Sequence, residues 1–227
     1  MLKSFPRMAS VATLALYLAA CLATPPVASA QGRKLMPVDE ASEDKTFLAF
    51  RDRLLEAAKR RDTKFVMSAV HPRIRNSFGD NGGAREFRRK WKPENPDSEL
   101  WETLVEILRL GGSFREAGKG RDFWAPYVYS NFPEDLDAFE YMAVTGENVN
   151  VRQRPDPASA VISTLSYDLV KAPDGLPHKA GGWTKIITPG GEEGFVSGRF
   201  LRSPVDYRAA FTKVNGRWVM SALVAGD

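Results

Sequence analysis

The chain has 227 residues, of which 32 are Lys or Arg and 28 are Asp or Glu, so its formal net charge is +4. The length allows one large domain or two small ones, and the composition is that of an ordinary globular protein. This charge is too small to indicate nucleic-acid binding by itself. With a single cysteine, the chain cannot form an internal disulfide.

Residues 1–30 have the pattern of a secretory signal peptide. Lys3 and Arg7 form a positive start, and residues 11–22 form an uncharged apolar run that is too short for a permanent membrane-spanning helix. Small residues at positions 28–30 provide a cleavage site. Removal of this leader also removes Lys3 and Arg7, which lowers the formal charge from +4 to +2. We therefore expect a periplasmic or secreted mature protein.

The leader also carries a second processing signal. Residues 18–21 read Leu-Ala-Ala-Cys, which resembles the lipobox of bacterial lipoproteins, whose cysteine becomes the lipidated first residue. Lipidation of Cys21 would anchor the mature chain in the envelope, whereas cleavage after Ala30 would leave a mature chain with no cysteine. Both alternatives stay open at the level of sequence.

Residues 31–43 are polar and are expected to be a linker. A helix-rich α+β region is then expected over residues 44–138. Apolar residues at helical spacing predict helices over 46–61, 62–70, 84–92 and 98–110. A short strand or turn is expected over 74–78, and one or two strands within the aromatic-rich stretch 113–132.

The stretch 84–92 is basic and contains two aromatic residues, a composition that also suits nucleic-acid or phosphate binding. Phe87 and Trp91 stand four residues apart, however, so they lie on one face of a helix. The pattern therefore favours a buried aromatic face and a solvated charged face.

Residues 139–203 contain several short alternating runs separated by Gly and Pro. The segment opens with Val-Asn-Val-Arg at 149–152 and a proline at 155, continues with Gly-Trp at 182–183, and closes with Gly-Phe-Val-Ser at 194–197 and Phe-Leu at 200–201. These landmarks, over residues 141–203, resemble the bacterial SH3 domain (SH3-like, SH3b type). The resemblance implies a small β-barrel and targeting to the cell envelope through peptidoglycan peptides or protein peptides.

Residues 204–227 predict a β-hairpin, because the dipeptide Asn215-Gly216 between two alternating runs is a strong signal for a two-residue turn. A lone hairpin is marginal in water, so it is expected to pack on residues 44–138, with the SH3-like segment inserted between them. This arrangement resembles the nuclear-transport-factor-2-like cone fold. The expected fold class is α+β, a small SH3-like barrel plus a helix-rich domain completed by the hairpin; two consecutive domains are the alternative.

The sequence offers few groups for catalysis. Its two histidines, His71 and His178, are far apart and lack zinc-ligand spacing, and the sole cysteine lies in the leader, so no metal or catalytic thiol is expected. Ser42 and Lys45 have the spacing of penicillin-interacting serine enzymes but lack the partner motifs, so Ser42 is interpreted as a helix cap. Four acids are candidates for a glycosidase pair, although each is also expected of a solvated surface: Glu102, Glu106, Glu116 and Asp122.

These patterns favour a non-catalytic bacterial cell-envelope protein whose SH3-like module binds a peptidoglycan-associated or protein peptide ligand. Arg154 replaces the Gly that the family commonly has before its proline. Candidate contacts are the polar Arg154 and Asp168 and the flat apolar surfaces of Tyr167 and Trp183. The expected partners are peptidoglycan or an envelope protein, with no nucleic acid and no cofactor, and a membrane only if Cys21 is lipidated.

Three alternatives remain. A cell-wall hydrolase predicts carboxylates converging in a pocket among Trp101, Phe123 and Trp124. A small-molecule-binding α+β domain predicts an open apolar cavity without paired acids. A purely structural role makes the SH3-like segment a packing element of one rigid body, which proteolysis would not release as a stable fragment.

Overall fold

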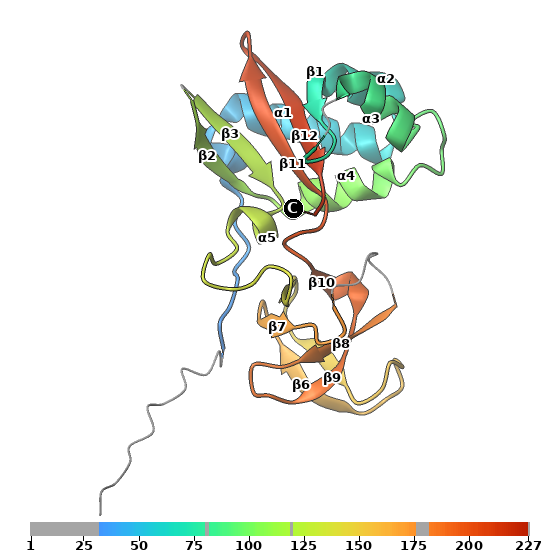
Figure 1. The fold of residues 1–227 in the computed structure, drawn as a ribbon, viewed down its shortest axis with the longest axis vertical. Helices are drawn as coiled ribbons and strands as arrows, with labels where there is room; N and C mark the ends of the chain where they lie inside the picture. The colour runs from blue at the N-terminus through green and yellow to red at the C-terminus, as the bar shows by residue number, and fades with distance from the viewer. Residues whose placement is uncertain (1–31, 80–81, 119, 176–181, 227) are drawn as a thin grey trace, which may run out of the picture.

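The computed structural model describes residues 32–79, 82–118, 120–175 and 182–226. The predicted signal peptide, Cys21 and His178 lie outside these residues. The described chain is α+β, with five α-helices and two sheets arranged in two lobes (Figure 1). We call the lobe that carries the helices the helical lobe, and the lobe formed by residues 139–203 the sheet lobe. None of the helices in the described ranges is long and apolar enough to cross a membrane.

The helical lobe contains a five-stranded sheet in the order β1-β12-β11-β3-β2. Its strands are β1 (Val70–Arg75), β2 (Ser113–Ala117), β3 (Gly120–Ala125), β11 (Arg208–Val214) and β12 (Arg217–Val224). Asn215 and Gly216 join β11 to β12 with positive φ angles of 48° and 79°, as a tight two-residue hairpin turn requires. The predicted hairpin is confirmed, and it lies inside the sheet because β11 pairs with β3 and β12 pairs with β1.

Helices pack on this sheet where apolar residues recur at helical spacing. They are α1 (Lys45–Lys59), α2 (Thr63–Ala69), α3 (Gly83–Trp91), α4 (Leu100–Arg109) and α5 (Tyr127–Ser130), with a short 3-10 turn η1 (Glu40–Glu43). In α3, Phe87 and Trp91 are buried and the charges face solvent, as predicted. The cap of α1 is Asp44 rather than Ser42: its carboxylate accepts from the backbone N–H groups of Thr46 (2.8 Å) and Phe47 (3.0 Å).

Aromatic side chains fill the space between the helices and the sheet. Phe47 lies 4.3 Å from Phe123 and 4.9 Å from Trp218, measured between ring centroids, and all three are buried. Trp101 is buried in the same core. Packed rings fill the space around Phe47, Phe123 and Trp218, because burial of large apolar surfaces drives folding.

The sheet lobe contains a seven-stranded antiparallel sheet in the order β10-β4-β7-β8-β9-β5-β6. Its strands are β4 (Tyr141–Val144), β5 (Val149–Arg152), β6 (Val161–Leu165), β7 (Leu169–Lys171), β8 (Trp183–Ile187), β9 (Glu193–Ser197) and β10 (Leu201–Arg202), with the 3-10 turn η2 (Gly198–Phe200) before the last. Strands β10 and β6 stand at its two edges, so the sheet is not closed into a barrel. Its inward residues form a separate apolar core.

Residues 33–39, which we call the strap, connect the two lobes (Figure 1). In the sheet lobe, the backbone N–H of Leu35 donates to the carbonyl of Tyr167 (2.8 Å). At the other end, Asp39 forms a parallel bridge with Gly112 beside β2. The segment that sequence predicts to be a linker is therefore packed against both sheets.

An apolar cluster covers the junction of the lobes. Leu35 of the strap packs there with Tyr127 and Val128 of α5 and with Ala143 and Leu169 of the sheet lobe, and all five are buried. A cluster of this kind resists relative motion of two lobes because separating them exposes apolar surface to water.

Candidate functional site

The sheet lobe carries a surface cavity of about 490 Å³ between β5, the β8–β9 pair and η2. We call this cavity the groove. Its lining combines one acid, two guanidinium groups, two side-chain amides and several apolar surfaces. The lining residues are Glu147, Asn148, Val149, Asn150, Arg152, Pro157, Gly182, Trp183, Ser197, Arg199 and Phe200.

Strand alternation places the polar groups of β5 in the groove. Val149 and Val151 point into the sheet-lobe core, with exposed fractions of 3% and 0%, so Asn150 and Arg152 lie on the opposite face. The Arg152 guanidinium donates to the carbonyl of Ser159 (2.6 Å), which fixes its direction. The strand thus presents a guanidinium and an amide side by side on the surface.

Trp183 forms the flat apolar wall of the groove. It is the first residue of β8. Thr184 and Ile186 of this strand point into the core and are buried, whereas Trp183 points to the opposite face and is half-buried. It pairs directly with Ser197 of β9, so the groove is framed by paired strands rather than by loops alone. A half-exposed indole on a paired strand offers apolar contact area at low entropic cost.

The charges of the groove do not neutralise one another. Glu147, Arg152 and Arg199 form no ion pair among the residues that the structure describes. The Arg199 guanidinium lies 4.5 Å from the centroid of the Phe200 ring. A ligand with both a carboxylate and an amine therefore meets groups of opposite charge here.

The structure does not bring the four predicted contact residues together. Trp183 lines the groove, whereas Arg154 is exposed beyond the end of β5 and outside the lining. Asp168 is buried against the strap, where it pairs with Lys34 (3.2 Å) and accepts from the Ser166 N–H (2.7 Å). Tyr167 contacts the strap through its backbone carbonyl, which accepts a hydrogen bond from the Leu35 N–H. The groove residues that sequence reasoning missed include Asn150 and Arg152, and the alternation of residues 149–152 was the signal that identifies them.

The four candidate acids do not form one site. Glu102 and Glu106 lie one turn apart on α4 and line another cavity, whereas Glu116 and Asp122 lie on the β2–β3 pair. Glu106 is held by the buried Arg202 (2.7 Å). Across the described ranges, no group of three or more His, Cys, Asp or Glu side chains is arranged to hold a metal ion.

Comparison with known proteins gives no family. No family model matches the chain, and no curated protein matches it significantly. A solved chain named Rd1NTF2_05, in a form with five substitutions, is similar at a TM-score of 0.30 and 11% identity, covering 81% of this chain and 99% of that chain. So low a score carries no argument about fold or function, and the groove must be interpreted from its own chemistry.

Proposed function

We propose that this is a non-catalytic bacterial cell-envelope protein whose residues 139–203 form an SH3-like module that binds a peptide ligand in the groove. The ligand is a peptide-bearing component of peptidoglycan or a peptide segment of an envelope protein. The observation that carries the proposal is the lining itself, in which a half-buried indole stands beside unneutralised groups of both charges and two amides.

Peptides match this combination of groups. The side chains of Asn148 and Asn150 each offer a donor and an acceptor to a peptide backbone. Arg152 suits a carboxylate because a guanidinium binds carboxylates in a bidentate manner, and Glu147 suits an amine. The Trp183 ring provides apolar contact for a side chain or a sugar face. Wall peptides carry carboxylates and amines on a short chain, so they use every part of this lining.

The sheet lobe also supports the SH3-like assignment. Its short antiparallel strands enclose a small core of their own, and the landmarks of the resemblance fall on β5, β8, β9 and the η2–β10 corner. These are the elements that line the groove. The leader-like residues 1–30 support placement in the envelope, either in soluble form or anchored through Cys21.

The test is co-sedimentation of the chain from Gln31 onward with purified peptidoglycan, using two arginines as a matched pair. Arg152→Ala removes a groove guanidinium, and Arg154→Ala removes an exposed one outside the groove. We expect Arg152→Ala and Trp183→Ala each to weaken binding at least tenfold, about 1.4 kcal/mol, and Arg154→Ala to leave it unchanged.

Circular dichroism and thermal unfolding control for the fold of each variant. Equal binding by wild type, Arg152→Ala and Trp183→Ala would refute the groove as the site. Absence of sedimentation for wild type would exclude intact peptidoglycan and direct the search to an envelope protein peptide.

A further inference from the structure

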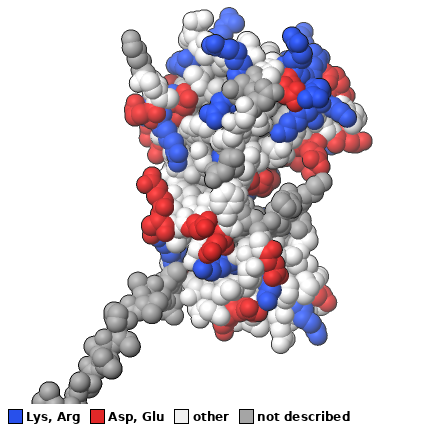
Figure 2. All heavy atoms as spheres, in the orientation of Figure 1, with Lys and Arg blue, Asp and Glu red and all other residues white. Residues whose placement is uncertain are grey.

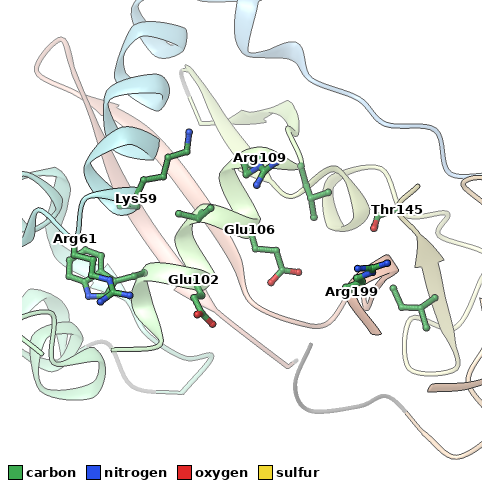
Figure 3. A pocket seen from close by; sticks show the side chains of 12 residues that line it. Lys59, Arg61, Glu102, Glu106, Arg109, Thr145 and Arg199 are labelled. Carbon is green, nitrogen blue, oxygen red and sulfur yellow. The ribbon is translucent and has the colours of Figure 1, made fainter. Parts of the chain in front are cut away.

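A second cavity, of about 550 Å³, lies between the lobes, and we call it the interlobe cavity (Figure 3). One wall comes from α4 and from the end of α1 with the turn after it. The other wall comes from Thr145, which follows β4, and from η2 and β10. Its volume is within the range of small-molecule sites, about 300–1,000 Å³. The lining residues are Ala58, Lys59, Arg61, Trp101, Glu102, Val105, Glu106, Arg109, Leu110, Thr145, Arg199 and Leu201.

The cavity has an apolar floor. Trp101 and Leu201 are buried, with exposed fractions of 3% and 5%, and Val105 and Leu110 are half-buried beside them. Trp101 and Val105 come from α4, whereas Leu201 comes from β10 of the sheet lobe. An occupant therefore contacts apolar surface from both lobes at once.

Among the described charged side chains at the rim of the cavity, more cations than acids lack an ion-pair partner. Lys59 is paired with Glu56 (2.7 Å), and Glu106 is paired with the buried Arg202 (2.7 Å). Among the described residues, Arg61, Arg109 and Arg199 form no ion pair, and Glu102 is the one lining acid that also forms none.

Figure 3 shows how these groups surround the cavity. Arg61 lies near Glu102 at one end, Arg199 stands on the sheet-lobe side, and Arg109 and Glu106 project from α4. On the face in Figure 2, by contrast, basic and acidic side chains are interspersed over the helical lobe. Cations gathered around a concave apolar surface strengthen one another's potential and attract anions.

We propose that the interlobe cavity binds a small amphiphilic organic anion, with an apolar body on Trp101 and two acidic groups at the arginine rim. In the described part of the chain, three guanidinium groups without an ion pair outnumber the one lining carboxylate without one, Glu102, so the rim favours an anionic ligand. Guanidinium groups suit carboxylate and phosphate oxygens through paired hydrogen bonds. This proposal does not rest on the proposed peptide groove; Arg199 lines both cavities.

Isothermal titration calorimetry with naphthalene-2,6-dicarboxylate tests the proposal, with the uncharged naphthalene-2,6-dicarboxamide as a matched probe. We expect wild type to bind one dicarboxylate at least tenfold more tightly than the diamide, and higher salt to weaken the binding. The variants Arg61→Gln and Arg109→Gln remove exposed charges from the rim, and each is expected to weaken dicarboxylate binding at least fivefold.

The control variants are Arg154→Gln, an exposed arginine outside the cavity, and Trp183→Ala, which changes the groove alone. Both are expected to bind the dicarboxylate as wild type does. Absence of dicarboxylate binding, equal binding of the diamide, or equal losses in Arg109→Gln and Arg154→Gln would each overturn the proposal. Because Trp183→Ala separates the two sites, failure of one proposal does not imply failure of the other.

Discussion

Arg202 links the two lobes electrostatically, and its removal gives a quantitative test of the interface. Its side chain is 4% exposed, and one guanidinium nitrogen lies 2.7 Å from Glu106 of α4 and 3.2 Å from Asp206. Arg202→Met keeps the apolar stem but leaves both carboxylates without their cation. Breaking a buried ion pair costs about 3–5 kcal/mol. The carboxylates are 37% and 30% exposed and regain water, so we expect the low end, about 3 kcal/mol.

Urea unfolding of wild type, Arg202→Met, Glu106→Gln and the double variant measures this cost. For a chain of this size, a loss of about 3 kcal/mol lowers Tm by roughly 6–12 °C. Glu106→Gln alone is expected to cost about 1 kcal/mol, because Asp206 still neutralises the guanidinium. The double variant is expected to lose less than the sum of the single variants. A loss below 1 kcal/mol in Arg202→Met, or strict additivity, would refute the reasoning.

Three further predictions concern the cap, the strap and the junction. Hydrogen bonds from the Thr46 hydroxyl and from two backbone N–H groups lower the pKa of Asp44 from 3.8 to about 2. The stabilisation by this cap is therefore present above pH 4 and is lost as the pH falls toward 2. In urea unfolding at neutral pH, Asp44→Ala is expected to cost about 1 kcal/mol, and Asp44→Asn less. Leu35→Ala leaves a cavity in the junction cluster, so it is expected to lower the free energy of unfolding by about 2–4 kcal/mol and to speed proteolysis between the lobes. An unchanged rate of proteolysis would contradict a packed strap. Burial raises the pKa of Tyr127 to about 12, so folding loses stability as pH rises above 10; Tyr127→Phe removes that loss, measured by unfolding at pH 8 and 11.

Local patterns predicted the elements whose stability is local. Four helices follow from apolar spacing, and the turn at Asn215 and Gly216 follows from the positive φ that these residues tolerate. Burial of Phe87 and Trp91 follows from their separation by one helical turn. In each case the residues that decide the structure lie within a few positions of one another.

Long-range pairing was not accessible to the same reasoning. The strap falls in the predicted linker, yet Leu35 is buried, and its backbone pairs with that of Tyr167, 132 residues away. That pairing also removes Asp168 from the set of accessible groups, since Lys34 covers it. Only part of the groove could be predicted. Trp183 was identified by its motif, but Arg199 lines the groove because η2 folds back beside β5 and β8, which local sequence does not indicate.

The most direct test of the proposed function is to map the binding site on the intact chain by NMR. Soluble disaccharide-peptide fragments of peptidoglycan are titrated into the ¹⁵N-labelled chain from Gln31 onward. We expect the largest shifts at the backbone amides of Asn150 and Arg152 and at the indole N–H of Trp183, with β11 and β12 unaffected. Shifts confined to the helical lobe, or none at millimolar fragment, would contradict a peptide-binding groove in the sheet lobe.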